Sequence, residues 1–139
     1  MLIEVDWTDI SDERHRLWLD QLCLYAYLHP RRAWLLYLGK ADFCTVRQRL
    51  RGAHKDRLFE DCWNEFGIDE FRVLHGRLVL DDGCRRSSEL LSDVESLLIK
   101  RLLPFGNIQC RTQRIARPNT RVVCSGDWPF KRARFHDVY

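Results

Sequence analysis

The stretch LYAYLHPRRAWLLYLGKAD, residues 24–42, decides the fold that the sequence predicts. Two short runs that are almost entirely apolar, 22–28 and 33–39, are separated by His-Pro-Arg-Arg, a pattern typical of an antiparallel hairpin. Because neither run alternates with polar residues, we expect both faces of these strands to be covered. Tyrosine is a good strand residue, so Tyr25 and Tyr37 are core aromatics unless the residues around them give them a chemical role.

The segments on either side of the hairpin predict helices that pack on the sheet. The ranges 44–54 and 55–67 each place apolar residues on one helical stripe, and Gly52 is the expected break between the two helices. The range 87–103 repeats apolar residues at a 3.6-residue period until a proline stops it. A short helix within 11–21, capped by Ser11, is also expected.

A further strand and a strand pair complete the predicted fold. The β-branched and aromatic residues of 71–80 are typical of a strand, in which His75 is interpreted as a packed or hydrogen-bonded core residue. A strand pair is expected around 121–124. The order of these elements indicates an α+β fold with a central three-stranded antiparallel β-sheet flanked by helices.

The length of 139 residues and the hydrophobic content of 45% fit one compact domain. Charge is distributed unevenly along it: the first thirty residues carry six acids against two arginines, whereas 108–139 carry six arginines and a lysine against two aspartates. We therefore expect core motifs at 22–109, a basic C-terminal extension at 110–139, and polyanions as partners. Arg114 and Arg117 are candidates for phosphate contacts, with ordinary surface charge as the alternative.

The six cysteines are widely spaced and form no C-x-x-C pair, and the N-terminus has neither a basic leader nor an apolar signal segment. Reduced thiols in a cytoplasmic protein are therefore expected. Cys23 and Cys62 stand among apolar neighbours and are interpreted as small hydrophobic residues, with a thiol-ligated zinc ion as the alternative. No stretch approaches the length of a membrane span, so a membrane is not an expected partner.

Glu95 is a residue that core packing does not explain. On the helix 87–103 it falls among Leu91, Leu98 and Leu102, where a carboxylate is costly unless it is paired or bound to a cation. The alternative is a capping box in which Ser92 is the cap and Glu95 reaches back to it. That alternative would leave two leucines that fit the helix outside it.

Arg49, Gly39 and Lys40 are further candidates. Arg49 lies at the edge of the apolar stripe of 44–54 and can reach inward, where a guanidinium suits a phosphate; the alternative is a helix-edge arginine whose stem covers apolar surface. Gly39 and Lys40 end the second strand, where a glycine allows close backbone approach and a lysine adds charge, although a simple turn has the same pattern.

These residues resemble, in content and order, the five-part signature of the GIY-YIG endonuclease superfamily. The matching motifs are Cys23-Leu24-Tyr25, Tyr37-Leu38-Gly39-Lys40, VRQRL with Arg49, VESLLIK with Glu95, and LLPFGNIQ with Asn107. Each motif is short, but five in register over residues 22–109 are fairly specific. The resemblance implies an active site on the surface of the sheet.

The resemblance also implies roles for the matching positions. Tyr25 and Tyr37 would stand near the attacking water, Arg49 on the scissile phosphate, and Asn107 as a positioning residue. Glu95 would be the ligand of one divalent cation, Mg²⁺ or Mn²⁺, which prefers hard oxygen ligands and neutralises charge on the phosphate. Tyr25 could act as a general base only if nearby cations favour its phenolate.

Three features depart from the family pattern. Cys23 replaces the glycine of the first motif. The loop between Gly39 and the arginine is longer than in the family, so that counting residues from Gly39 would place Arg47 at the position of the family's arginine. The apolar neighbours of Arg49, however, reproduce the family's helix pattern. His54 follows that arginine by five residues instead of four, which makes it a partial candidate for the substrate-binding set.

The resulting hypothesis is a metal-dependent endonuclease, a hydrolase of phosphodiester bonds in nucleic acid and most directly in DNA. The alternative is a non-catalytic nucleic-acid-binding module with the same fold. Cutting two strands with one site would favour a homodimer or sequential nicks. Whether the substrate is duplex, branched or damaged DNA, or RNA, stays open at the level of sequence.

Overall fold

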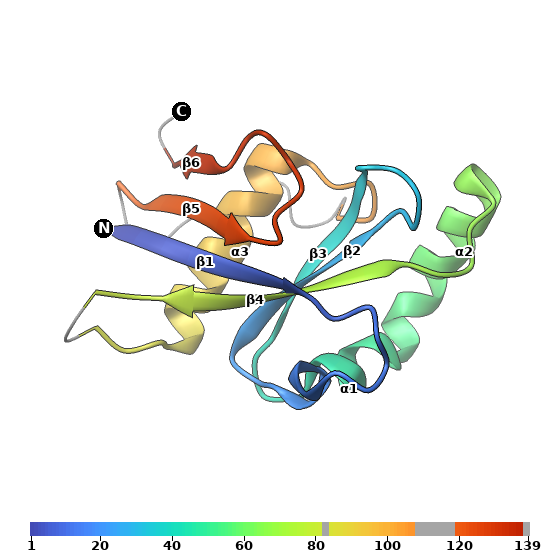
Figure 1. Cartoon of the computed structure of the whole chain (residues 1–139), viewed down its shortest axis with the longest axis horizontal. Helices are drawn as coiled ribbons and strands as arrows, with labels where there is room; N and C mark the ends of the chain where they lie inside the picture. The colour runs from blue at the N-terminus through green and yellow to red at the C-terminus, as the bar shows by residue number, and fades with distance from the viewer. Residues whose placement is uncertain (82–83, 108–118, 138–139) are drawn as a thin grey trace.

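The computed structural model describes residues 1–81, 84–107 and 119–137, except for the side chain of His54 (Figure 1). Within these ranges, six strands form one mixed sheet in the order β3-β2-β4-β1-β5-β6. The strands are β1 (Leu2–Asp9), β2 (Cys23–Leu28), β3 (Leu35–Ala41), β4 (Arg72–Val79), β5 (Arg121–Gly126) and β6 (Arg134–His136).

The helices follow the predicted segments closely because local signals fix their ends. They are α1 (Val46–Leu50), α2 (Asp56–Phe66) and α3 (Ser88–Leu102), with short 3-10 helices η1 (Arg16–Leu19) and η2 (Ala53–Lys55). Thr45 forms a capping box with Gln48 at the start of α1, and Gly67, at a φ of 66°, ends α2 in the left-handed conformation. The side chain of Ser87 caps α3.

The chain has the α+β class that the sequence predicts, but the described sheet has six strands instead of three. Strands β3, β2 and β4 are paired antiparallel, and β1 adds antiparallel to β4 and parallel to β5. In β1, Ile3, Val5 and Trp7 are buried while the residues between them are more exposed, which is the alternation of a half-buried strand. This strand was not among the elements expected from the sequence.

The C-terminal segment, expected as a basic extension, contributes β5 and β6 to this sheet in its described part. In Figure 1, β5 lies beside β1, close to the N-terminus, and β6 lies on the far side of β5. The buried residues Val122, Cys124 and Phe135 join the core on the α3 side. This part of the segment is therefore integral to the fold.

Two cores cover opposite faces of the sheet. On one face, Leu24, Ala26 and Leu38 pack against the apolar side of α3. On the other, Tyr25 and Tyr27 pack with residues of α1 and α2. Every residue of β2 is buried, as its continuous apolar run predicts.

The predicted helix within 11–21 is wrong in its start and its length. The structure has only the short η1, which follows His15, because Ser11 is used elsewhere: its hydroxyl donates to Asp9 at 2.6 Å and accepts from the backbone N–H of Val73 at 3.0 Å. In the part of the chain described, no helix combines the length and the apolar character that a membrane crossing requires.

Candidate functional site at the β3 edge

Tyr25 on β2 lies directly against Gly39 on β3, its partner in the strand register. A Cβ atom at Gly39 would stand 2.6 Å from the Cζ and Oη atoms of Tyr25, which is closer than any packed carbon can lie. The ring of Tyr37 is 6.1 Å from that of Tyr25, centre to centre. Glycine is therefore required here so that the phenol of Tyr25 can cross the backbone of β3.

Lys55 is a member of this cluster that the sequence did not reveal. Its side chain is buried, and its Nζ atom donates to Tyr37 Oη at 3.3 Å and lies 4.4 Å from the ring centre of Tyr37. Burial, together with the nearby Arg49, lowers the pKa of Lys55 to about 8. An amine with this pKa is neutral in an appreciable fraction of molecules near neutral pH, so it can accept a proton.

Arg49 projects from α1 toward the same cluster. Its Nε atom is buried and has no hydrogen-bond partner among the described residues, and its charge opposes the rise in the pKa of Tyr25. Arg47, the residue that counting would nominate, donates instead to the backbone carbonyl of Glu13 at 2.7 Å. The structure thus favours Arg49 as the arginine of the site, since a buried unsatisfied donor calls for a ligand.

Glu95 reaches the site from α3. Since α3 begins at the Ser87 cap, Ser92 is inside the helix, where its hydroxyl accepts a hydrogen bond from Lys40, and the capping-box alternative is wrong. Burial raises the pKa of Glu95 to about 7, although Lys40, Arg49 and Lys55 oppose this rise. Three cations therefore surround a half-buried carboxylate at the edge of the sheet. The short hydrogen bond from Lys40 to Ser92 holds one of these cations beside α3.

Asn107 has its amide fully engaged with the backbone of β3. Its Nδ2 donates to the carbonyl of Leu38 and its Oδ1 accepts from the N–H of Leu38, both at 2.8 Å, while Gly106 donates to Leu36. The segment around Asn107 thereby covers the outer edge of β3, and the side chain fixes the strand between Tyr37 and Gly39. The positioning role that the resemblance implies for Asn107 stays a prediction.

The phenol of Tyr25 is kept protonated by its surroundings. It is 1% exposed, and burial, with Tyr37 and Tyr27 beside it, raises its pKa well above the ordinary value, more than Arg49 lowers it. The described side chains therefore do not favour the phenolate that a Tyr25 general base requires. Tyr37 is half-buried and is the tyrosine that solvent can reach.

The donor atoms at Glu95 suit a hard cation in part. Asp42 lies close enough to raise the pKa of Glu95, so two carboxylates are near one another, although Asp42 also accepts from Ser88 Oγ at 2.7 Å. Mg²⁺ is commonly held by one or two carboxylates with water and substrate phosphate completing its shell. Glu95 would be the principal ligand.

Three of the predicted substrate-binding residues are not placed. The side chain of His54, and the whole of Arg114 and Arg117, lie outside the described residues. The predictions made for them stay predictions.

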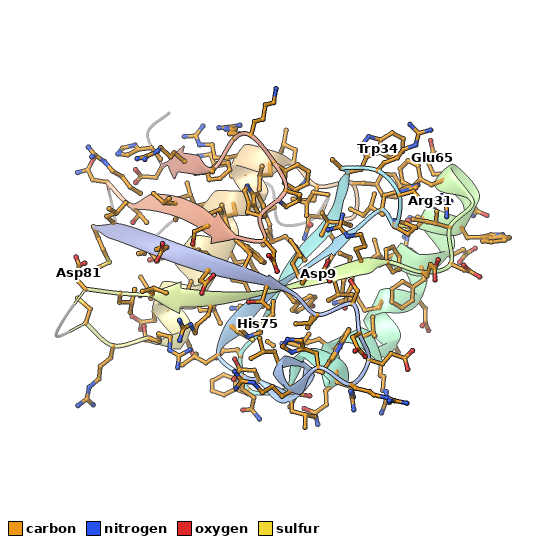
Figure 2. The ribbon with its side chains drawn as sticks, viewed as in Figure 1. Asp9, Arg31, Trp34, Glu65, His75 and Asp81 are labelled. Carbon is orange, nitrogen blue, oxygen red and sulfur yellow. The ribbon has the colours of Figure 1, made fainter. Side chains whose placement is uncertain are left out.

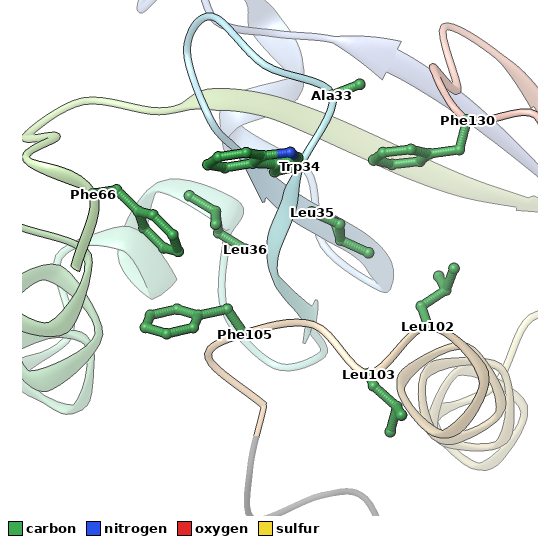
Figure 3. Close-up of a pocket in the computed structure, with 9 residues that line it drawn as sticks. All are labelled: Ala33, Trp34, Leu35, Leu36, Phe66, Leu102, Leu103, Phe105 and Phe130. Atoms are coloured by element: carbon green, nitrogen blue, oxygen red, sulfur yellow. The ribbon is translucent and has the colours of Figure 1, made fainter.

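A hollow of about 500 Å³ lies beside the start of β3 and is a different kind of site (Figure 3). Its lining is apolar and is made by Ala33, Trp34, Leu35, Leu36, Phe66, Leu102, Leu103, Phe105 and Phe130. Trp34 lies near the end of α2 that carries Glu65 (Figure 2), and its ring is 5.6 Å from that of Phe66. Without an ionisable group in its lining, this hollow offers nothing to hold a phosphate.

Tyr25, Tyr37, Arg49, Lys55 and Glu95 form what we call the β3 site. They come from β2, β3, α1, η2 and α3, and the charges of Arg49 and Lys55 act on both the tyrosine side and the Glu95 side. Function is inferred from these side chains and from the resemblance of their motifs, because no protein-family model, curated protein or solved structure matches the chain.

Proposed function

We propose that the chain is a divalent-metal-dependent endonuclease of the GIY-YIG type that hydrolyses phosphodiester bonds in DNA. The observation that carries the proposal is the buried Nε atom of Arg49, which has no hydrogen-bond partner among the described residues and stands near the carboxylate of Glu95 and the tyrosine pair. A phosphate would accept a hydrogen bond from the guanidinium, and a cation bound to that phosphate would be held by the carboxylate. The antiparallel trio β3-β2-β4 with α1 and α3 also fits the fold that the resemblance implies.

Arg49 would bind the scissile phosphate and supply charge where charge develops in the transition state. Glu95 and Asp42 would hold the cation, which when bound neutralises phosphate oxygens. Lys40, which donates a hydrogen bond to Ser92, adds positive potential on the side of the site next to α3.

The proton of the attacking water would pass to the pair formed by Tyr37 and Lys55. Lys55 contacts the hydroxyl of Tyr37 at 3.3 Å, and its pKa of about 8 lets the neutral amine receive a proton that Tyr37 relays. Tyr25, protonated and buried, would serve to orient Tyr37 instead of acting as the base. This division of roles differs from the one that the sequence motifs imply for Tyr25.

A non-catalytic nucleic-acid-binding module is the second candidate. The observation that favours it is the burial of Tyr25, whose hydroxyl cannot approach a substrate unless the cover of α1 and η2 moves. Such a module would bind through Arg49 and Lys40 and would need no cation.

Incubation of supercoiled plasmid with the purified protein separates the two candidates. The enzyme should nick with Mg²⁺ or Mn²⁺ and not with a chelator, and Glu95→Gln and Arg49→Gln should each lower the nicking rate by several orders of magnitude while the fold persists. Arg51→Gln, on the exposed side of the same turn, is the matched control and should nick like the parent protein. DNA binding without nicking in any cation would instead establish the binding module.

A further inference from the structure

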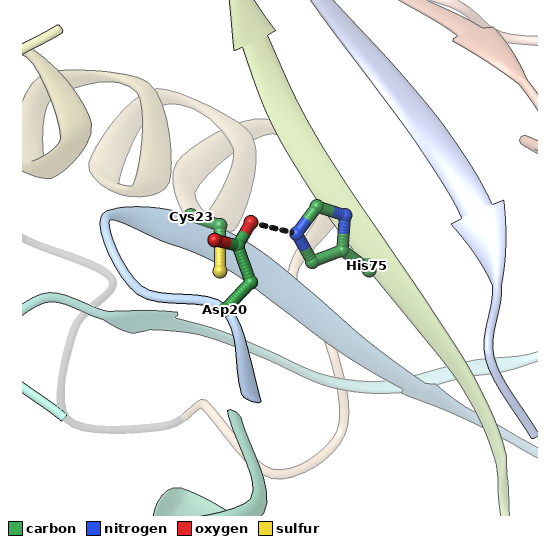
Figure 4. A group of neighbouring side chains, drawn as sticks. All are labelled: Asp20, Cys23 and His75. Atoms are coloured by element: carbon green, nitrogen blue, oxygen red, sulfur yellow. Dashed lines mark hydrogen bonds and ion pairs between the residues drawn. The ribbon is translucent and has the colours of Figure 1, made fainter. Parts of the chain in front are cut away.

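Asp20, Cys23 and His75 bring three different donor atoms together away from the β3 site (Figure 4). Asp20 ends η1, Cys23 is the first residue of β2, and His75 lies in the middle of β4. Their oxygen, sulfur and nitrogen atoms lie within 4.8 Å of one another, and Asp20 Oδ2 is 2.7 Å from His75 Nε2. This is the only such group of three that the described part of the chain contains.

We propose that Asp20, Cys23 and His75 bind one Zn²⁺ ion, with the fourth coordination position open to solvent. Thiolate, imidazole and carboxylate are the three ligand types that zinc accepts, whereas Mg²⁺ and Ca²⁺ avoid sulfur and nitrogen. At zinc–ligand distances of about 2.0–2.3 Å, tetrahedral ligand atoms are ~3.3–3.8 Å apart. The three donor atoms lie within 4.8 Å of one another, and the 2.7 Å contact between Asp20 and His75 is shorter than a zinc site requires, so a side-chain rotation that separates these two atoms would complete the site.

A polar hollow of about 540 Å³ gives access to the cluster. Asp20 and His75 are part of its lining, together with Arg16, Arg77 and Arg86, whereas Cys23 is fully buried. An ion entering here would meet Asp20 and His75 first. The three arginines around the opening favour water or an anion at the fourth position.

Burial affects the two buried ligands in opposite senses, because it favours the metal-binding form of His75 and disfavours that of Cys23. Burial lowers the pKa of His75, despite the contact with Asp20, and so favours the neutral imidazole that coordinates a metal. Burial, with Asp20 beside it, raises the pKa of Cys23 to about 12, so the metal-free thiol carries its proton. Binding replaces the S–H bond by an S–Zn bond and releases that proton to solvent.

The structural alternative is that the hydrogen bond between Asp20 and His75 merely attaches η1 to the sheet. The bond uses Nε2 of His75, whereas Nδ1 is buried without a hydrogen-bond partner among the described residues. The two interpretations differ in the role of Cys23. A structural bond makes no use of its thiol, whereas a zinc site requires it as a thiolate.

Titration of chelator-treated protein with Co²⁺, followed by Zn²⁺, tests the proposal. We expect one equivalent of Co²⁺ to bind with a thiolate-to-cobalt charge-transfer band that Zn²⁺ abolishes by displacement, and Zn²⁺ to raise the Tm. Cys23→Ala and His75→Gln should lose the band; His75→Gln can still donate to Asp20, so its fold should persist. Cys124→Ala, which removes an equally buried thiol on β5, is the matched control and should keep the band.

Absence of the band in the parent protein, or its persistence in Cys23→Ala, would overturn the proposal. If Cys23→Ala does not fold, X-ray absorption of the zinc-loaded parent protein decides: one sulfur ligand with nitrogen and oxygen supports the site, and a shell without sulfur refutes it. Because no readout uses DNA cleavage, the result is independent of the proposed nuclease activity.

Discussion

Replacing Glu95 by glutamine should make the metal-free protein more stable, and the gain should depend on pH. The pKa of Glu95 is raised from 4.5 to about 7, mainly by burial. The folded state therefore binds this proton more tightly than the unfolded state, and stability falls as the pH rises from about 4.5 to about 7. Glutamine keeps the shape of the side chain and removes the charge, so this loss should disappear.

The magnitude follows from the difference between the two pKa values. At about 1.4 kcal/mol for each pH unit, the rise corresponds to ~3 kcal/mol above pH 7. This figure is an upper limit, because Lys55 loses a favourable neighbour in the variant. At pH 4.5 the carboxyl is protonated in the folded state and half-protonated in the unfolded state, so the parent protein and Glu95→Gln should have nearly the same stability.

Guanidinium unfolding of both proteins at pH 4.5 and pH 8, with chelator, measures this difference. Glu65→Gln, an exposed change at the end of α2 (Figure 2), is the control and should shift the free energy of unfolding equally little at both pH values. Mg²⁺ at pH 8 should stabilise the parent protein and not Glu95→Gln. A Glu95→Gln protein that is less stable than the parent at pH 8 with chelator would refute the reasoning.

Three further changes test other contacts of the site. Lys55→Met should raise the free energy of unfolding at pH 7 by ~1–3 kcal/mol. This gain should shrink as the pH rises from about 8 to 10.5, because at the upper end of this range the amine of the parent protein is neutral in both the folded and the unfolded state. Unfolding curves across this pH range measure the change. Gly39→Ala should displace the ring of Tyr25, lower the free energy of unfolding in guanidinium by about 1–3 kcal/mol and abolish plasmid nicking. A variant within ~0.5 kcal/mol of the parent protein would contradict the close approach of Tyr25 to Gly39. Asn107→Ala removes both hydrogen bonds to Leu38 and should lower the free energy of unfolding by about 2–4 kcal/mol in the same assay. If water replaced both hydrogen bonds to the backbone of Leu38, the loss would be less than about 1 kcal/mol.

The parts of the site that the sequence could predict rest on short-range periodicity. The 3.6-residue period of 87–103 placed Glu95 on the apolar side of a helix, and the structure has that helix with Glu95 half-buried. The pattern around Arg49 likewise separated it from Arg47, which turns out to contact Glu13. These inferences need only neighbours within one or two turns of a helix.

Lys55 could not be found in this way. The break at Gly52 was expected, but the 3-10 helix η2 that follows it and changes the phase of the chain between α1 and α2 was not. As the first residue of the predicted helix 55–67, a lysine has no reason to be buried. The burial of Tyr25 agrees with the covered faces expected for its strand, whereas the residues of α1 and α2 that cover it come from distant segments and could not be named from the local pattern.

Strand β1 shows the same limit at larger scale. Its alternation is visible in the sequence, but its place in the middle of the sheet depends on pairing with β4 and β5, which lie far along the chain. No local pattern encodes that parallel partner.

The position of β1 also has a consequence for the order in which the protein folds. Strand β1 is synthesised before the other five strands of the described sheet, yet one of its neighbours, β5, follows all of them except β6. Until residues 121–126 are available, the edge of β1 that they cover is an open template for another chain, and the buried side of Ile3 and Val5 lacks Val122 and Phe135. Long-range pairing of this kind forms slowly. Nascent or C-terminally shortened chains should therefore depend on chaperones far more than the finished protein does.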